Sequence, residues 1–350
     1  MVWDIFCRVI DNYGDIGVCW RLGADLASRG ERVRLWVDDP SPLAWLAPQG
    51  CDGVDVIHWS PHAAVAEPGD RVVEAFGCEL PLQFQTALAR KAALHGAIPW
   101  VNLEYLTAEP FAERSHGLPS PVLSGPASGL TKHFFYPGFT SRTGGLLREP
   151  ATMSHRAAFD RAQWLAQQGI AFAGEQLVSL FCYEPAALPA LLDQLAAGAQ
   201  PSRLLVTPGR ATLAVKAVAG GRDAWGSLAI TWLPPLPQPE FDRLLWACDL
   251  NFVRGEDSLV RALWAGNPLV WQAYPQEDGA HHQKIDAFLD AIGAPASLRQ
   301  FHAAWNGAGT AALPQPDLPA WGQAMLKART SLLRQDDLAS QLLRFVQKKR

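Results

Sequence analysis

The sequence predicts an α/β protein built from two domains, each organised around a mainly parallel sheet. Its 350 residues exceed what one hydrophobic core usually organises and fit two domains of roughly 150 residues or a little more each. Short apolar runs alternate with amphipathic stretches along most of the chain, which is typical of strands followed by helices. With 49% hydrophobic and 18% charged residues, the composition is that of a compact globular protein.

The first half of the chain begins with a strand, a turn and a helix. Residues 2–10 form a mostly apolar run that suits a parallel strand covered on both faces. A polar turn follows, and then a helix in which Val18, Leu22 and Leu26 recur every fourth residue. This helix should end near Gly30, because glycine is favoured just beyond a helix C-terminus. Further strands are predicted over residues 33–37, 54–59, 71–76 and 100–103, with a helix over residues 82–94.

The second half repeats this alternation. It follows a segment, residues 107–149, that is rich in Pro, Gly, Ser and aromatic residues and is expected to form loops with short strands. Predicted strands cover residues 177–183, 204–207, 228–232, 250–253 and 269–272, and predicted helices lie near residues 187–196, 210–218, 239–247 and 257–265. We therefore expect an N-terminal domain over residues 1–155, a C-terminal domain over 156–325, and a terminal helix within 326–350 that packs back on the first domain.

Composition also excludes several classes of function. The formal net charge is -4 and the basic residues are scattered, so a nucleic-acid partner is not expected. The chain begins without a signal peptide and has no run of eighteen apolar residues, which predicts neither export nor a membrane span. Its six cysteines form no C-x-x-C pair and are interpreted as reduced core residues of a cytoplasmic protein.

Two acids stand in the turn that follows the first strand. Asp11 and Asp15 lie where a parallel sheet presents the ends of its strands, which is where such sheets bind ligands. They could instead be ordinary turn residues, with Asp15 capping a helix that starts near Val18. The turn lacks a G-x-G-x-x-G phosphate loop, and two carboxylates there would repel phosphate. The first domain is therefore a plausible acceptor site and a poor nucleotide site.

The segment around residue 255 has the features of a diphosphate site. A predicted strand ends just before Arg254, Gly255 turns the chain, and a helix begins that Asp257 or Ser258 could cap. Backbone N–H groups at the helix start, with Arg254 beside them, suit a diphosphate, and Glu256 or Asp257 could accept bonds from sugar or ribose hydroxyls. The alternative is an ordinary acidic helix start.

A second loop, residues 274–282, follows the next strand and adds polar groups at the same predicted edge. Its adjacent histidines, His281 and His282, cannot point the same way on a helix, and no D-x-D motif occurs in a plausible loop, so no catalytic metal is predicted. Three aromatic residues could sandwich a pyrimidine base or could simply belong to the core; they are Phe181, Tyr183 and Phe241.

Four segments together resemble the arginine rhamnosyltransferases of elongation factor P. They are F-C-x-V-I-D-N-Y-G-D-I-G-V-C-W-R-L at residues 6–22, N-L-E-Y-L-T-A-E at 102–109, R-G-E-D-S at 254–258 and W-Q-A-Y-P-Q-E-D at 271–278. The resemblance spans both predicted domains. It departs from the family pattern at Thr107, where serine is expected, and the hydroxyl is retained.

This resemblance implies an inverting GT-B glycosyltransferase, in which two facing Rossmann-like domains place the active site in the cleft. The C-terminal domain would bind dTDP-β-L-rhamnose, and the N-terminal domain would hold the acceptor, elongation factor P, through that factor's N-terminal KOW-like domain. The product would be α-rhamnosyl-arginine, which activates the factor for translation of polyproline stretches. Neither a metal nor another cofactor is implied.

The resemblance also assigns roles to residues. Asp15 corresponds to the general base, Asp11 to a neighbour that positions the arginine, and Glu256 to a third acid on which activity depends. The implied donor-binding residues are Phe181, Tyr183, Gln238 and Phe241 on the thymidine side and Arg254, Glu256, Asp257, Ser258 and Tyr274 near the diphosphate, ribose or sugar. Two other functions stay open at this point: a transferase with the same architecture but another sugar or acceptor, and a non-catalytic module that binds a translation factor.

Overall fold

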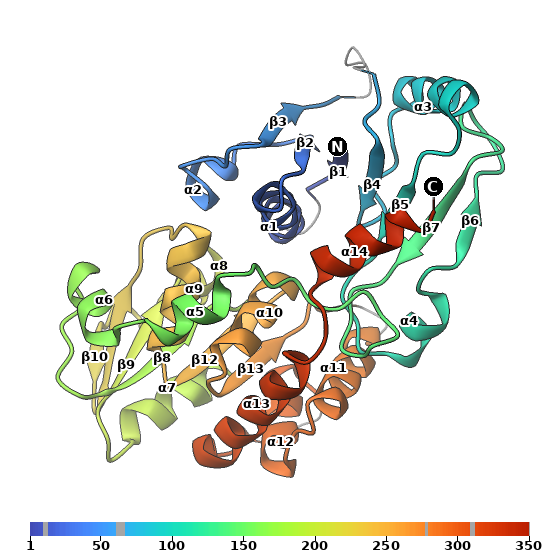
Figure 1. Ribbon diagram of the computed structural model, residues 1–350. Coiled ribbons are helices and arrows are strands. Elements are labelled where there is room, and N and C mark those ends of the chain that lie inside the picture. Colours follow the sequence, from blue (N-terminus) through green and yellow to red (C-terminus); the bar gives the residue numbers. More distant parts are fainter. Residues whose placement is uncertain (10–12, 61–66, 277–278, 309–311, 350) are drawn as a thin grey trace. The chain divides into compact units, whose positions relative to one another are not determined.

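The structure, a computed structural model, describes residues 1–9, 13–60, 67–276, 279–308 and 312–349. The chain forms two compact units, each with its own sheet: the first unit comprises Met1–Pro150 with Gln335–Arg350, and the second comprises Ala151–Arg334 (Figure 1). The predicted boundaries, 155/156 and 325/326, fall inside helices α5 (Thr152–Ala157) and α13 (Leu318–Leu332). The observed boundaries lie outside both helices, at 150/151 and 334/335, so each helix belongs entirely to the second unit. A continuous hydrogen-bonded helix is rigid and is not expected to be divided between two units.

The first sheet has the strand order β3-β2-β1-β4-β5-β7-β6. All its pairs are parallel except β6 with β7 at the edge. The strands are β1 (Val2–Cys7), β2 (Arg32–Val37), β3 (Val54–His58), β4 (Arg71–Ala75), β5 (Trp100–Leu103), β6 (Pro119–Pro121) and β7 (Thr131–Phe135). The five strands predicted for this half are present, but the first, predicted over residues 2–10, ends at Cys7. The segment expected to be mostly loops adds β6, β7 and helix α4 (Pro110–Ser115), and β7 is a full member of the parallel sheet.

Helix α1 (Gly14–Ser28) packs on this sheet with Leu22 and Leu26 fully buried. It ends as predicted, since Gly30 has a φ of +85°, a conformation that glycine adopts without strain. It begins four residues before Val18, however, so Asp15 lies inside the first turn and does not cap the helix. The other helices of this unit are α2 (Leu43–Leu46), α3 (Leu82–His95), α4 and α14 (Leu338–Gln347).

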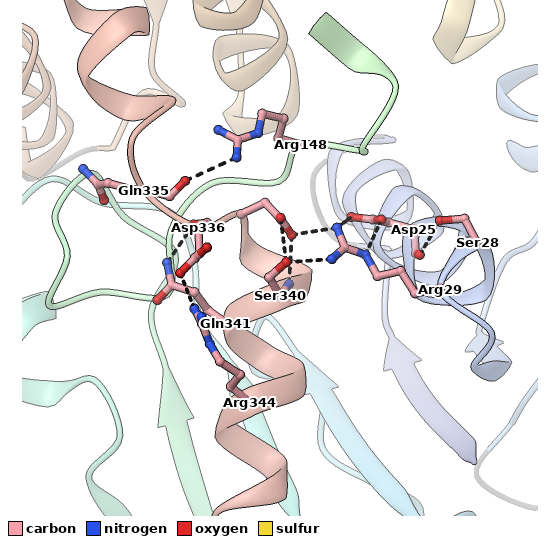
Figure 2. A network of polar contacts seen from close by, with 10 residues as sticks. Asp25, Ser28, Arg29, Arg148, Gln335, Asp336, Ser340, Gln341 and Arg344 are labelled. Carbon is pink, nitrogen blue, oxygen red and sulfur yellow. Dashed lines mark hydrogen bonds and ion pairs between the residues drawn. The ribbon is translucent and has the colours of Figure 1, made fainter. Parts of the chain in front are cut away.

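The C-terminal helix α14 completes the core of the first unit. Leu342 and Val346 are fully buried in the same cluster as Ile5 and Leu22. Polar contacts lie beside this packing. The Arg29 guanidinium at the end of α1 donates to Asp25 Oδ1 (2.8 Å) and Ser340 Oγ (2.6 Å) (Figure 2). It also donates to Asp337 Oδ1 at 2.8 Å. Asp337 also caps α14, accepting from the Ser340 N–H at 2.8 Å. One arginine therefore joins the first helix of the unit to its last.

The second sheet has the order β10-β11-β9-β8-β12-β13, parallel apart from the short edge strand β10. Its strands are β8 (Gln176–Leu180), β9 (Ser202–Val206), β10 (Ala224–Trp225), β11 (Leu228–Trp232), β12 (Leu250–Arg254) and β13 (Leu269–Gln272). Its helices are α5, α6 (Arg161–Gln167), α7 (Leu188–Ala197), α8 (Arg210–Ala219), α9 (Gln238–Ala247), α10 (Glu256–Ala265), α11 (Ala280–Ala291), α12 (Ala296–Trp305) and α13. Among the helices described, none combines the length and apolarity that crossing a membrane requires.

Replacing Arg29 with methionine should destabilise the first unit. Asp25 is fully buried at its side chain, and burial already raises the pKa of this carboxyl although Arg29 opposes the shift. Removing Arg29 leaves that carboxylate without its cation and releases Asp337, so we expect the free energy of unfolding to fall by about 2 kcal/mol at neutral pH. Urea unfolding followed by circular dichroism measures this. Arg32→Met, an exposed arginine on β2, is the control, and equal stability of the two variants would contradict the assignment.

Candidate functional site

The predicted donor-binding residues gather at one edge of the second sheet. We call this the carboxyl edge, the edge at which the parallel strands end. Strands β8, β12 and β13 are neighbours. Phe181 and Tyr183 follow β8, Arg254 ends β12, and Tyr274 follows β13. The predicted strand over residues 177–183 stops at Leu180, so these aromatic residues lie beyond the sheet, where their rings can meet groups from the neighbouring loops.

Arg254 lies against two aromatic rings. Its guanidinium carbon is 4.6 Å from the centroid of the Phe181 ring and 4.5 Å from that of Tyr183. Tyr183 in turn meets Tyr274 edge-on at 5.5 Å, and Phe181 meets Phe241 of α9 at the same distance. Cation–π contacts of this kind hold a guanidinium in place while leaving its N–H groups able to bond anions. The residues predicted for the base and those predicted for the diphosphate thus form one aromatic and cationic cluster.

The turn between β12 and α10 is built around Gly255. Its φ of +68° favours glycine, and its carbonyl accepts a hydrogen bond from the Trp271 indole at 2.8 Å. Helix α10 begins at Glu256, so the prediction that Asp257 or Ser258 caps it is wrong: Gly255 occupies the N-cap, and the Ser258 hydroxyl donates to the Arg254 carbonyl. The helix therefore starts without a side-chain cap. Its N-terminal partial positive charge favours an anion at this position.

Two cations near this site were not predicted from the sequence. Lys284 of α11 forms an ion pair with Glu256, with 2.6 Å between Nζ and Oε1. Arg210, at the start of α8, lies 5.1 Å from the Tyr183 ring and donates to Glu184 at 2.8 Å. No periodic pattern marks a single lysine or arginine on a helix, and both reach the site through folding. With Arg254 they bring three cationic side chains to the carboxyl edge of the second sheet, two of them paired with carboxylates, and cationic side chains are suited to bind a diphosphate.

Helices α9 and α10 are held together by a buried ion pair. Arg261 donates to both oxygens of Asp242, at 2.9 and 2.6 Å, and both residues are less than a tenth exposed. Gln238, also buried, is the first residue of α9, one turn before Asp242. A bidentate pair at this depth fixes both the distance and the orientation of the two helices. The ion pair thereby fixes the positions of Gln238 and Phe241 on α9 relative to Glu256 at the start of α10.

Asp15 occupies the corresponding edge of the first sheet. It lies in the first turn of α1, after the end of β1, and is only 4% exposed. Its charge is one of the influences that raise the pKa of Cys7 well above its ordinary value, after the hydrogen bond with Cys19 and burial. The first turn of a helix favours a carboxylate because the helix dipole is positive there. Asp11 lies outside the described residues, as do Glu277 and Asp278 of the fourth family-like segment.

Among the residues that the structure describes, no three His, Cys, Asp or Glu side chains are grouped so that they could hold a metal ion.

The two α/β units, each with a mainly parallel sheet, have the GT-B fold. The fold is similar to that of WaaG, a glycosyltransferase involved in lipopolysaccharide biosynthesis, with a TM-score of 0.50 and 15% identity over 99% of each chain. At that identity the likeness concerns the fold alone, and it confirms the predicted fold class.

Sequence comparison identifies the family. The family described as Elongation-Factor P (EF-P) rhamnosyltransferase EarP matches residues 3–347. The protein-arginine rhamnosyltransferase of Pseudomonas aeruginosa is 43% identical over 98% of both chains. A structure solved to explain EarP-mediated arginine glycosylation of translation elongation factor EF-P matches with a TM-score of 0.69 and 32% identity, over 100% of this chain and 99% of that one. The chain belongs to the EF-P rhamnosyltransferase EarP family.

A buried histidine supports the strand that carries Trp271. The Trp271 N–H donates to His302 Nε2 at 3.0 Å, so the proton of the neutral ring is on Nδ1, which faces the Leu298 carbonyl at 3.0 Å. Burial lowers the pKa of His302 to about 4 from an ordinary value of 6.5. Protonation would place a hydrogen on Nε2, facing the Trp271 backbone N–H, and the hydrogen bond between them would be lost. The ring therefore has to stay neutral for β13 to keep its place beside the Gly255 turn.

Stability should consequently fall in mild acid. His302 is neutral in both states above pH 6.5; between that pH and about 4 only the unfolded chain binds the proton, so stability is lost as the pH falls. From pH 7 to pH 5 we expect a loss of about 2 kcal/mol from this residue. Urea unfolding at both pH values measures the loss, which should largely disappear in His302→Gln and persist in His95→Gln, where the histidine is exposed. Identical pH dependence in all three proteins would refute the role.

Proposed function

We propose that this chain transfers L-rhamnose from dTDP-β-L-rhamnose to an arginine side chain of translation elongation factor P, with inversion at the anomeric carbon. The observation that carries the proposal is the family match over nearly the whole chain, from residue 3 to residue 347. Relatives of this chain are named protein-arginine rhamnosyltransferases. The α-rhamnosyl-arginine product would make the factor active in translating polyproline stretches, and we expect the enzyme in the cytoplasm with that factor.

In this proposal the second unit binds the donor. Phe181, Tyr183 and Phe241 supply aromatic faces for thymine, with Gln238 as a polar neighbour at the start of α9. Arg254 would bond the diphosphate together with N–H groups at the start of α10. Asp257 and Ser258, in the first turn of α10, and Tyr274, which is 56% exposed, would meet the ribose or the sugar. The clustering of these groups supports the proposal.

The first unit would hold the acceptor. A guanidinium has a pKa above 12 and is a poor nucleophile while it is charged. Asp15 would take a proton from the guanidinium as its nitrogen bonds to the anomeric carbon, while the bond from that carbon to the diphosphate oxygen breaks and its electron pair leaves with dTDP. Asp11 would help grip the guanidinium. Since binding alone favours the cation, Asp15 has to act as positive charge grows in the transition state.

Charge on the leaving dTDP would be stabilised by Arg254 and the start of α10, a task that other transferases give to a metal. Glu256 is the third acid of the proposal and would accept bonds from the sugar hydroxyls. Its ion pair with Lys284 keeps a carboxylate close to the diphosphate without an uncompensated negative charge. The proposed reaction needs no metal and no other cofactor.

Intact mass spectrometry tests the reaction directly. Purified elongation factor P, incubated with this protein and dTDP-rhamnose, should gain the mass of one deoxyhexose. Asp15→Asn should abolish the gain because the proton acceptor is lost, whereas Asp55→Asn, which removes an exposed carboxylate on β3, should leave it intact. The same assay with UDP-sugars should give no product. Modification by a UDP-sugar alone would indicate another transferase, and binding without any modification would indicate a non-catalytic module.

Arg254→Ala should reduce both the rate and the affinity for the donor. If the guanidinium stabilises the leaving diphosphate, kcat should fall about 100-fold in addition to a rise in the KM for dTDP-rhamnose. Steady-state kinetics at saturating acceptor separate the two effects. Arg222→Ala, an exposed arginine of the same unit, serves as the control. A change in KM alone would assign Arg254 to ground-state binding and remove it from the leaving-group role.

A further inference from the structure

The segment Asn102–Glu109, one of the four family-like segments, has no role in the reaction described above. It begins in β5, and Glu104 is the first residue beyond that strand. Strands β1, β4 and β5 are adjacent and parallel, so Glu104 emerges at the same carboxyl edge of the first sheet as Asp15. One strand, β4, thus separates this segment from the strand that precedes the proposed acceptor acid.

Glu104 is a half-buried carboxylate outside the ion pairs of the described residues; Lys132, which pairs with Glu74, acts on it only from beyond ion-pair distance and lowers its pKa against the larger effect of burial. Its hydrogen bond is with the Asn102 side-chain amide, which donates to Oε1 at 2.7 Å, and no Lys, Arg or His in the described part of the chain lies within ion-pair distance. The contrast is Glu74 of β4, whose carboxylate pairs with Lys132 at 2.7 Å. Burial raises the pKa of Glu104. A neighbouring cation from a partner would offset this cost of burial.

The side-chain oxygen of Asn102 is a second hydrogen-bond acceptor to which no described group donates. The residue is only 8% exposed, and its Oδ1 has no hydrogen-bond partner among the described residues. The orientation of the amide is set by the carboxylate, since Nδ2 has to face Glu104. Buried acceptors are nearly always satisfied in folded proteins, so an unsatisfied one beside an unpaired carboxylate points to a missing donor.

Aromatic residues occupy the same edge of the first sheet. Tyr105, which is 38% exposed, stacks on Phe76 with the centroids 4.8 Å apart and the planes at 23°. Phe76 follows β4 with a φ of +57°, an uncommon conformation for a bulky residue, and its N–H donates to the Leu103 carbonyl at 2.8 Å. Tyr136, beyond β7, has its pKa raised by burial and by the charge of Glu104. Tyr105, the next residue along the chain after Glu104, therefore presents exposed aromatic surface of the kind that binds cations at the same edge of the sheet.

We propose that Glu104, Asn102 and Tyr105 form a subsite for a second cationic side chain of the acceptor protein, an arginine or a lysine separate from the arginine that is glycosylated. This rests on the proposed function, in which the first unit holds the acceptor. A carboxylate, an amide oxygen and an aromatic face together suit a guanidinium or an ammonium group. The subsite would read the acceptor's sequence or surface beside the target and so contribute to specificity.

The spacing of the strands separates the two cations. Adjacent strands lie about 4.8 Å apart, so β1 and β5 are separated by about 10 Å. One guanidinium cannot bond to both Asp15 and Glu104 across this distance, so the two carboxylates would bind two different cations. An extended acceptor segment advances about 3.3 Å per residue, which places the second cation roughly three residues from the target arginine, or on an adjacent loop of the acceptor.

The test compares Glu104→Gln with Glu67→Gln, which removes the same charge from an exposed residue just before β4, at the opposite edge of the sheet. With elongation factor P as acceptor, Glu104→Gln should raise the acceptor KM about tenfold, the effect of losing one charge-assisted bond. The donor KM and the kcat at saturating acceptor should stay at the wild-type values. Glu67→Gln should change none of them. Tyr105→Leu, which removes only the aromatic face, should raise the acceptor KM by a smaller factor.

Acceptor variants identify the partner of Glu104. Each lysine and arginine near the target arginine of elongation factor P is replaced by methionine in turn, and one replacement should raise the KM of the wild-type enzyme but not that of Glu104→Gln. An unchanged acceptor KM in Glu104→Gln would overturn the subsite. So would a result in which every acceptor variant raises the KM of Glu104→Gln by the same factor as that of the wild-type enzyme. A purely structural role would instead lower the free energy of unfolding and disturb the donor KM. If the wild type fails to modify elongation factor P at all, the proposed function fails first.

Discussion

Parallel pairing of buried strands is the constraint on which the rest of this structure depends. Because every parallel strand of a sheet ends at the same edge, residues far apart in the sequence are delivered to one place. In the second unit, β8, β12 and β13 bring Tyr183, Arg254 and Tyr274 together. In the first unit, the same rule places Asp15 and Glu104 at one edge. Each site is therefore a property of the sheet order more than of any one loop.

The charges at the second edge have to be balanced within a partly buried environment. Glu256 and Lys284 form one pair, and Arg210 and Glu184 form another. The pair of Arg261 with Asp242 is buried and bidentate, and breaking such a pair costs far more than an exposed contact contributes. It is therefore suited to hold α9 and α10 at a constant spacing. These pairs explain how a site for a charged donor can also be well ordered.

The first unit is assembled from two separate parts of the chain. Residues 1–150 supply all seven strands, and residues 335–350 return to add α14 to the same core. Apolar packing of Leu342 and Val346 accounts for the burial of this helix, and the contacts of Arg29 with Asp25 and Asp337 specify its position. The segment that crosses from the second unit is also anchored, since the Gln335 carbonyl accepts from Arg148 at 3.3 Å (Figure 2).

The sequence alone determined the central parallel strands of both sheets, the end of α1 at Gly30 and the family, because apolar periodicity, glycine positions and long motifs are local signals. It did not locate short or irregularly placed elements such as β6, β7 and α4, which lack a clear period. Only the tertiary structure revealed that Lys284 pairs with Glu256, that Arg210 faces Tyr183 and that Arg261 joins α10 to α9. These partners are separated by up to 28 residues, and a lone cation on a helix has no pattern that names its partner. The same reason explains Glu104: its motif was visible in the sequence, but the absence of an ion pair, and the unsatisfied Asn102 Oδ1 beside it, could be seen only once the neighbouring strands were in place.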